Sequence, residues 1–203
     1  MADTTVRAGP SEAPAAVPSA VPSTIVPLRA IPIVVVVLGA LIAAIVSNKL
    51  WALDFFHVVG GALWTGVDLF LGLIIGPILR WMSIQARVEF SSRLMPKMLL
   101  LMPTLVIVTL AAGFQLARLL GTLNPSSPLH GWVVASFVVV GVLTVVAIGV
   151  LEPANLAVLF ELRKPRPNGE LIGRLMRRFV MTAGIIGAAQ VATLVIMTKL
   201  ASG

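Results

Sequence analysis

Five long apolar runs, separated by short polar stretches, dominate the pattern of this chain. A helix needs roughly 20 apolar residues to cross a hydrocarbon core of about 30 Å, and each run reaches that length. We therefore predict an all-α polytopic membrane protein with five transmembrane helices. The runs are Leu28–Ser47, Leu50–Leu79, Met98–Leu120, Trp132–Leu162 and Leu171–Leu200.

Short connections join the last four runs, so neighbouring helices must lie antiparallel to each other. We expect residues 50–201 to form an antiparallel four-helix membrane core and residues 28–47 to form a separate first anchor. Residues 1–27 are rich in Pro, Ala and Ser and predict a disordered tail. A cleaved secretory signal is the alternative for this beginning, but its polar lead is long and its apolar run reaches spanning length.

The linker from Trp81 to Lys97 has two interpretations. Trp81, Ile84 and Val88 recur at helical spacing among Arg and Ser residues, which suits a helix lying on the membrane surface. The same spacing fits a helical extension of the second run.

Basic residues alternate between the two sides of the predicted membrane helices. All but three of the fifteen Lys and Arg residues fall on the side of the N-terminus, and the exceptions are Lys49, Arg118 and Lys199. The positive-inside rule then predicts a cytoplasmic N-terminus and an external C-terminus in the cell (inner) membrane. We accordingly expect the net charge of +7 to bind anionic lipid head groups on the cytoplasmic side and not nucleic acid.

Composition narrows the chemistry further. The chain is 58% hydrophobic and contains neither Cys nor Tyr, so thiolate ligation, iron–sulfur clusters and disulfides are excluded. No phosphate-binding loop or nucleophile elbow is present. Redox chemistry in this chain would require a bound cofactor.

Polar residues inside a membrane are costly and are by default functional candidates. In the second run, Asp54 and His57 are spaced i,i+3, so the carboxylate is expected to orient one ring nitrogen and leave the other for a metal or haem. Counting along the helices places Gln190 and Thr193 at the level of His57. Asp68 and Glu152 lie deeper and are candidates for a proton relay.

Other residues at the level of His57 complete a candidate haem site. Arg118 and Lys49 are expected at the haem propionates. His130, in a loop before the fourth run, is a candidate second axial ligand. Met98 and Met102 form an i,i+4 pair that could suggest copper, but their position favours packing.

The sequence around His57 resembles a known superfamily. FFHVVGGALWTG at 55–66 and GPILR at 76–80 are similar to the first core helix of the HemJ and CopD-like membrane proteins, and LRKPRP at 162–167, RLMRRF at 174–179 and QVA at 190–192 are weaker echoes of its closing helix. The resemblance covers roughly residues 50–201. It implies a four-helix core and, in the HemJ branch, a b-type haem bound through His57.

Three function classes follow. The first is a b-type haem redox protein, or an electron-transfer subunit of a membrane oxidoreductase, with His57 as ligand. The second is a non-catalytic accessory subunit of a membrane complex, and the third is a metal or small-solute transporter, for which no inverted repeat is visible. A membrane protein partner or a homo-oligomer is expected. Gly72 with Gly76 and Ala183 with Gly187 offer close-approach surfaces for helices, which favour packing within one chain and leave a dimer interface as the alternative.

Overall fold

The computed structural model describes residues 27–202, and this part of the chain contains five helices long and apolar enough to cross a membrane. The all-α fold with five membrane spans is confirmed, and the protein is a multi-pass membrane protein. The predicted disordered tail lies outside the described residues except for Pro27. The spans are Leu28–Ser47, Leu50–Trp81, Ile84–Leu119, His130–Leu162 and Gly169–Ser202.

Two of the five spans are interrupted by π-helical segments. Leu71–Ile75 joins α2 to α3, and Ala147–Leu151 joins α5 to α6. A 3-10 turn, Leu28–Ala30, precedes the first helix. The α-helices are α1 (Ile31–Ser47), α2 (Leu50–Phe70), α3 (Gly76–Trp81), α4 (Ile84–Leu119), α5 (His130–Val146), α6 (Glu152–Leu162) and α7 (Gly169–Ser202).

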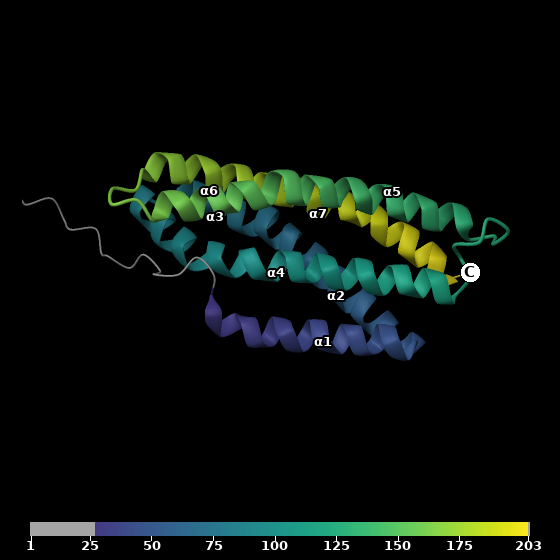
Figure 1. Cartoon of the computed structure of the whole chain (residues 1–203). Helices are drawn as coiled ribbons and strands as arrows, with labels where there is room; N and C mark the ends of the chain where they lie inside the picture. Colours follow the sequence, from purple (N-terminus) through teal and green to yellow (C-terminus); the bar gives the residue numbers. More distant parts are fainter. Residues whose placement is uncertain (1–26, 203) are drawn as a thin grey trace, which may run out of the picture.

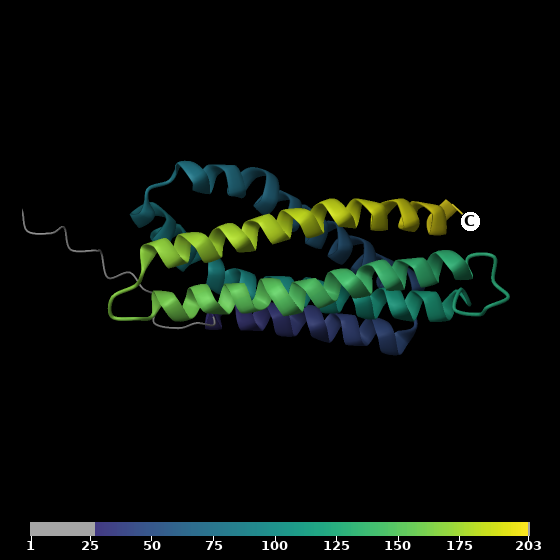
Figure 2. The same cartoon turned by 90° about the horizontal axis from the view of Figure 1, so that it is seen from above.

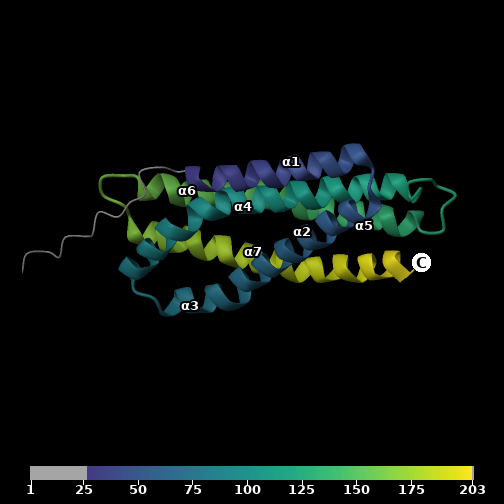
Figure 3. The same ribbon diagram turned by 90° about the horizontal axis from the view of Figure 1, so that it is seen from below.

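The last four spans form the antiparallel four-helix core, and α1 runs along its edge beside α4 (Figures 1 and 3). Figure 2 shows α7 between the α2–α3 span and the α5–α6 span. A large apolar cluster draws on all four core spans, whereas α1 packs through a separate small cluster of Leu41, Val108 and Ala112. The first span thus packs against α4 through a cluster separate from that of the core.

Both π-helical segments end just before a residue that is followed by proline, in Gly76-Pro77 and in Glu152-Pro153. Proline has no amide hydrogen, and its ring clashes with the carbonyl four residues earlier in an α-helix. A π-helical turn widens the backbone at that point. Pro77 and Pro153 therefore locally widen their spans and do not end them.

A buried asparagine, Asn155, attaches α6 to α4. Asn155 is 1% exposed, and with its amide oriented to satisfy both neighbours it donates to the Met95 carbonyl and accepts from the Leu99 amide, each at 3.2 Å. In an α-helix these two backbone groups normally bond to each other. Asn155 therefore inserts its amide beside one backbone bond of α4 and fixes the position of the two helices.

Glycines allow α2 and α7 to approach closely. A Cβ added at Gly72 would lie 2.2 Å from the Cα of Gly184, and one added at Gly187 would lie 2.8 Å from the amide nitrogen of Leu69. Small residues let membrane helices pack backbone against backbone. The predicted close-approach glycines Gly72 and Gly187 thus serve packing within one chain.

The linker from Trp81 to Lys97 differs from both expectations. The second span ends at Trp81, and α4 begins at Ile84 and continues unbroken to Leu119. The Ser83 hydroxyl accepts a hydrogen bond from the Ala86 amide at 3.2 Å, which is the contact of a helix N-cap. Most of the linker is therefore the beginning of the third span.

The helix order places charged residues at two opposite ends of the core. We call the end where α3 finishes and α7 begins the basic end, because it carries Arg80, Arg87, Arg174, Arg177 and Arg178. We call the opposite end, where α2 and α5 begin, the histidine end. Both histidines lie near it, since His130 is the first residue of α5 and His57 lies in the second turn of α2.

Candidate functional site

His57 lies half-buried in the contact between α2 and α4. Its Nδ1 is 2.9 Å from the backbone carbonyl oxygen of Thr109. A carbonyl can only accept, so this contact requires Nδ1 to carry a proton and to donate. The neutral ring then keeps the lone pair of Nε2, which has no hydrogen-bond partner within residues 27–202, for a ligand.

Glycine creates the space that the His57 ring occupies. A Cβ added at Gly113 would lie 2.6 Å from both Nδ1 and Cε1 of His57. One added at Gly60 would lie 2.7 Å from the Thr109 hydroxyl oxygen. These two glycines bring α2 and α4 close enough for the ring to reach a backbone carbonyl. Sequence reasoning missed Thr109 and Gly113, although the small-residue run at 111–113 was a signal for close packing.

Asp54 does not take the part predicted for it. Its side chain is exposed, and among the described residues neither a hydrogen bond nor an ion pair joins it to His57. The i,i+3 spacing puts both residues on one side of α2, but the imidazole turns into the contact with α4. The Thr109 carbonyl therefore replaces Asp54 as the group that orients His57.

The histidine end holds the remaining candidates for a haem site. Arg118 is exposed in the last turn of α4, and Lys49 immediately precedes α2. His130 begins α5 and does not lie in the preceding loop as expected; its Nδ1 is buried without a hydrogen-bond partner in the described part of the chain. No hydrogen bond joins the His57 and His130 rings within that part.

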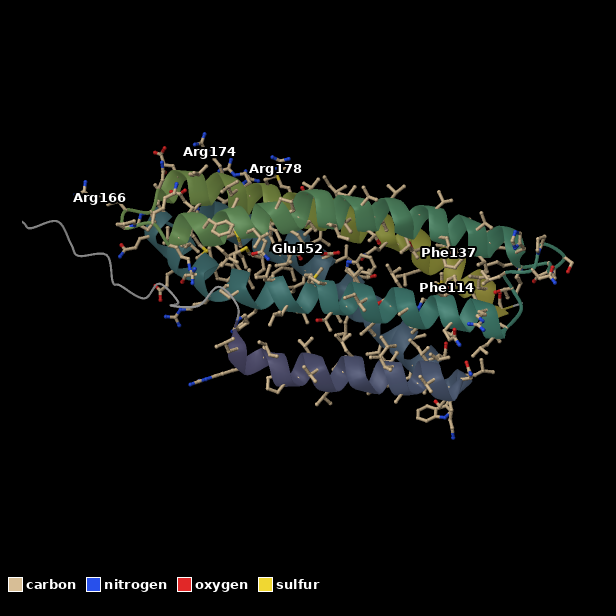
Figure 4. The ribbon with its side chains drawn as sticks, viewed as in Figure 1. Phe114, Phe137, Glu152, Arg166, Arg174 and Arg178 are labelled. Carbon is tan, nitrogen blue, oxygen red and sulfur yellow. The ribbon has the colours of Figure 1, made fainter. Side chains whose placement is uncertain are left out.

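Two contacts connect helices at the histidine end. Gln115 of α4 donates to the side-chain oxygen of Asn48 at 2.6 Å, which ties α4 to the turn between α1 and α2. The rings of Phe114 and Phe137, labelled in Figure 4, lie 6.2 Å apart and join α4 to α5. Phe114 and Gln115, which follow Gly113, thus attach this part of α4 to α5 and to the turn between α1 and α2.

A second polar group lies deeper, between α2 and α7. Asp68 is fully buried and accepts from Gln190 at 3.4 Å. Four atoms of this group are buried without a hydrogen-bond partner in the described residues: Trp64 Nε1, Asp68 Oδ1, Gln190 Oε1 and Thr193 Oγ1. Unsatisfied groups of this kind are rare and call for bound water, an ion or a functional role.

The contact between Asp68 and Gln190 corrects the predicted layers. Counting along the helices had placed Gln190 and Thr193 at the level of His57, away from Asp68. The second span has 32 residues and the last has 34, both more than the roughly 20 that a bilayer requires. A count from a helix end therefore does not fix the depth of a residue.

Glu152, the other predicted relay acid, lies in a different span, at the beginning of α6. It follows the π-helical segment Ala147–Leu151 and is half-buried within the bundle (Figure 4). No hydrogen bond or ion pair joins it to Asp68 in the region that the structure describes. A relay that uses both acids would need water or a movement between them.

In residues 27–202 no group of three His, Asp or Glu side chains comes together to hold a metal ion. Met98 and Met102 are buried in the main apolar cluster and act as packing residues, as predicted. The His57 imidazole could hold the iron of a porphyrin, whose own nitrogens would supply most of the remaining ligands.

No protein-family model matches this chain, and neither a curated protein nor a solved structure is significantly similar to it. The resemblance to the HemJ and CopD-like superfamily thus stays a prediction. Function must be argued from the geometry of this chain alone.

Proposed function

We propose that this protein is an integral-membrane, b-type haem-binding redox protein or a redox-complex subunit, with Nε2 of His57 as an axial ligand. The observation that carries the proposal is the 2.9 Å contact from His57 Nδ1 to the Thr109 carbonyl. Histidine ligands commonly donate their other ring N–H to a carbonyl or carboxylate, which fixes the tautomer and raises ligand basicity. Bound haem would supply reversible one-electron transfer.

Residues of the histidine end match the remaining needs of a haem. Arg118 is exposed in the last turn of α4, about 7.5 Å along the helix axis from Gly113, and would be the candidate partner of a haem propionate. Arginine pairs well with carboxylates, and Lys49 offers a second cation. His130 is the candidate second axial ligand in the chain, and a subunit of a complex or a second copy is the alternative source.

The buried group around Asp68 supports a coupled proton-carrying role. Asp68 lies in α2, the same helix as His57, and Gln190 and Thr193 lie in α7, which packs against α2. Each has a side-chain oxygen that is buried without a hydrogen-bond partner in the described residues. Ionisable groups within membrane helices are costly and often mark the paths of protons or ions. Glu152 belongs to the same proposal as a more distant acid.

A substitution at Gly113, whose missing side chain leaves room for the His57 ring, tests whether the position of that ring matters for haem binding. We expect Gly113→Ala to lower haem affinity by roughly 10- to 100-fold, the range seen when the group that orients a ligand is lost. The new methyl group would push the ring away from the Thr109 carbonyl. Gly141→Ala is the matched control, since nothing lies within 4 Å of the added Cβ. Equal haem affinity in the two variants, measured by haem titration, would contradict this geometry.

We also propose that the basic end faces the cytoplasm of a cell (inner) membrane, with the N-terminus cytoplasmic and the C-terminus external. The arginine-rich end and the positive-inside rule support this orientation. The absence of cysteine from the sequence allows a single-cysteine test.

In intact cells, Ser126→Cys, in the loop before α5, should react with a membrane-impermeant thiol reagent. Arg166→Cys, in the loop before α7, should react only after the membrane is permeabilised. Both positions are exposed, so access to the reagent depends on the side of the membrane. Labelling of Arg166→Cys alone in intact cells would reverse the orientation, and labelling of both would refute it.

A further inference from the structure

Three arginines from three helices line a small, partly open hollow at the basic end, with room for about one water molecule between the side chains as they stand. Arg80 of α3, Arg87 of α4 and Arg177 of α7 line it, and Leu79, Met176 and Val180 give it an apolar wall. Within the described residues the ion pairs are Arg93 with Glu89 and Lys164 with Glu161. No carboxylate in that region therefore neutralises the three arginines of the hollow.

Arg87 is held in place before any ligand binds. Its Nη2 donates to the Arg80 backbone carbonyl at 3.1 Å, and its Nη1 lies 3.5 Å from a Cβ added at Gly173, where glycine leaves the guanidinium room. Its Nε is buried and has no hydrogen-bond partner in the described part of the chain. A guanidinium that is held in place and still has an N–H group without an acceptor is well suited to bind an anion.

The position of the hollow along the bundle indicates the kind of anion. The first ten residues of α7 carry Glu170, Arg174, Arg177 and Arg178, and charged side chains are costly in the hydrocarbon core. We therefore expect these first turns of α7, including Arg177, to lie at the level of the lipid head groups. Basic pockets between membrane helices at this level suit lipid phosphates.

We propose that Arg80, Arg87 and Arg177 form a binding site for a phosphate group. The apolar wall of Leu79, Met176 and Val180 favours the phosphate of an anionic phospholipid, whose acyl chain would lie along it. A soluble phosphate compound presents the same chemistry from the aqueous side. Neither source requires haem, so this site is independent of the proposed redox function.

Neighbouring arginines of α7 provide a matched comparison. Arg177 lines the hollow, whereas Arg174 and Arg178 point away from the bundle in Figure 4. Arg177 and Arg178 are both exposed, so replacing either with Gln removes one charge from the surface of the same helix turn. Arg80→Gln makes the same change from a different helix, should one variant fail to fold.

The test measures binding of two probes to the full-length protein in neutral detergent micelles: a short-chain phosphatidic acid and inorganic phosphate. We expect Arg177→Gln and Arg80→Gln each to weaken phosphatidic acid binding by roughly tenfold, the loss of one charge-assisted hydrogen bond, and Arg178→Gln to change it less than about twofold. Inorganic phosphate should bind far more weakly than the lipid.

Other outcomes are equally informative. If inorganic phosphate binds as tightly as the lipid and is lost in the same two variants, the phosphate site stands and its source is a soluble compound. Equal losses in Arg177→Gln and Arg178→Gln would show only diffuse charge attraction and would overturn the proposal. Failure of the wild-type protein to bind either probe would also overturn it.

Discussion

Purified His57→Ala protein is expected to contain no bound haem, whereas the wild-type protein is expected to bind one haem per chain. The variant removes the only imidazole whose Nδ1 is held by a backbone carbonyl in the described residues, and with it the ligand nitrogen Nε2. Without a ligand from the protein to its iron, a haem would be held only by contacts to the porphyrin. Haem content and absorption of the detergent-purified variant, with helix content checked by circular dichroism, measure this effect.

Two further substitutions distinguish the ligand from its neighbours. Asp54→Asn should retain haem at close to the wild-type level, because Asp54 is exposed and does not contact His57. His130→Ala should have a smaller effect than His57→Ala, because within residues 27–202 no backbone carbonyl orients the His130 ring as Thr109 orients that of His57. Full haem occupancy in folded His57→Ala protein would reject His57 as the ligand.

Gly72→Ala is expected to destabilise the protein by about 1–3 kcal/mol or more, the usual cost of overpacking a close contact. The added Cβ would lie 2.2 Å from the Cα of Gly184. That atom belongs to the backbone of α7 and cannot turn aside as the end of a flexible side chain can. The helices would have to separate, which would also disturb the nearby contact between Asp68 and Gln190.

The control for this variant lies in the same span. Nothing approaches within 4 Å of a Cβ added at Gly66, so Gly66→Ala should stay within about 0.5 kcal/mol of the wild-type stability. Unfolding of both variants in mixed micelles of increasing denaturing detergent gives the comparison. Equal stability of the two variants would contradict the close contact between α2 and α7.

The spans were predictable because lipid imposes a simple requirement on sequence. Each span needs a long apolar run, and the expected Leu28–Ser47 agrees with the structure at both ends. The third span was misjudged at its beginning, since the helix starts at Ile84 and not at Met98. Its first turns carry Arg87 and Glu89, so they escape a criterion based on hydrophobicity, while the Ser83 N-cap signals the true start.

The candidate site was only partly predictable, for a physical reason. The rarity of polar groups in lipid singled out His57 and Asp68. The partner of His57 is a backbone carbonyl, and every residue carries one, so no sequence pattern identifies Thr109 as the acceptor. The pairing of Asp68 with Gln190 depends on how far α7 is shifted along α2, which a count of residues does not give.

The π-helical segments illustrate the same division. Pro77 and Pro153 predict a local disturbance of their helices, and the structure has one before each of them. Pro103 lies inside α4 without ending that helix. Two of these three prolines thus follow a π-helical segment and the third does not, a difference that residue type alone does not predict.

The most direct test of the haem proposal is the reduced-minus-oxidised absorption spectrum of the wild-type protein, purified in mild detergent from cells supplied with a haem precursor. The proposal predicts a Soret band and resolved visible bands of the reduced form at one haem per chain, and the loss of both in His57→Ala. A folded wild-type protein without a Soret band would contradict it and would leave a non-catalytic accessory subunit as the better description.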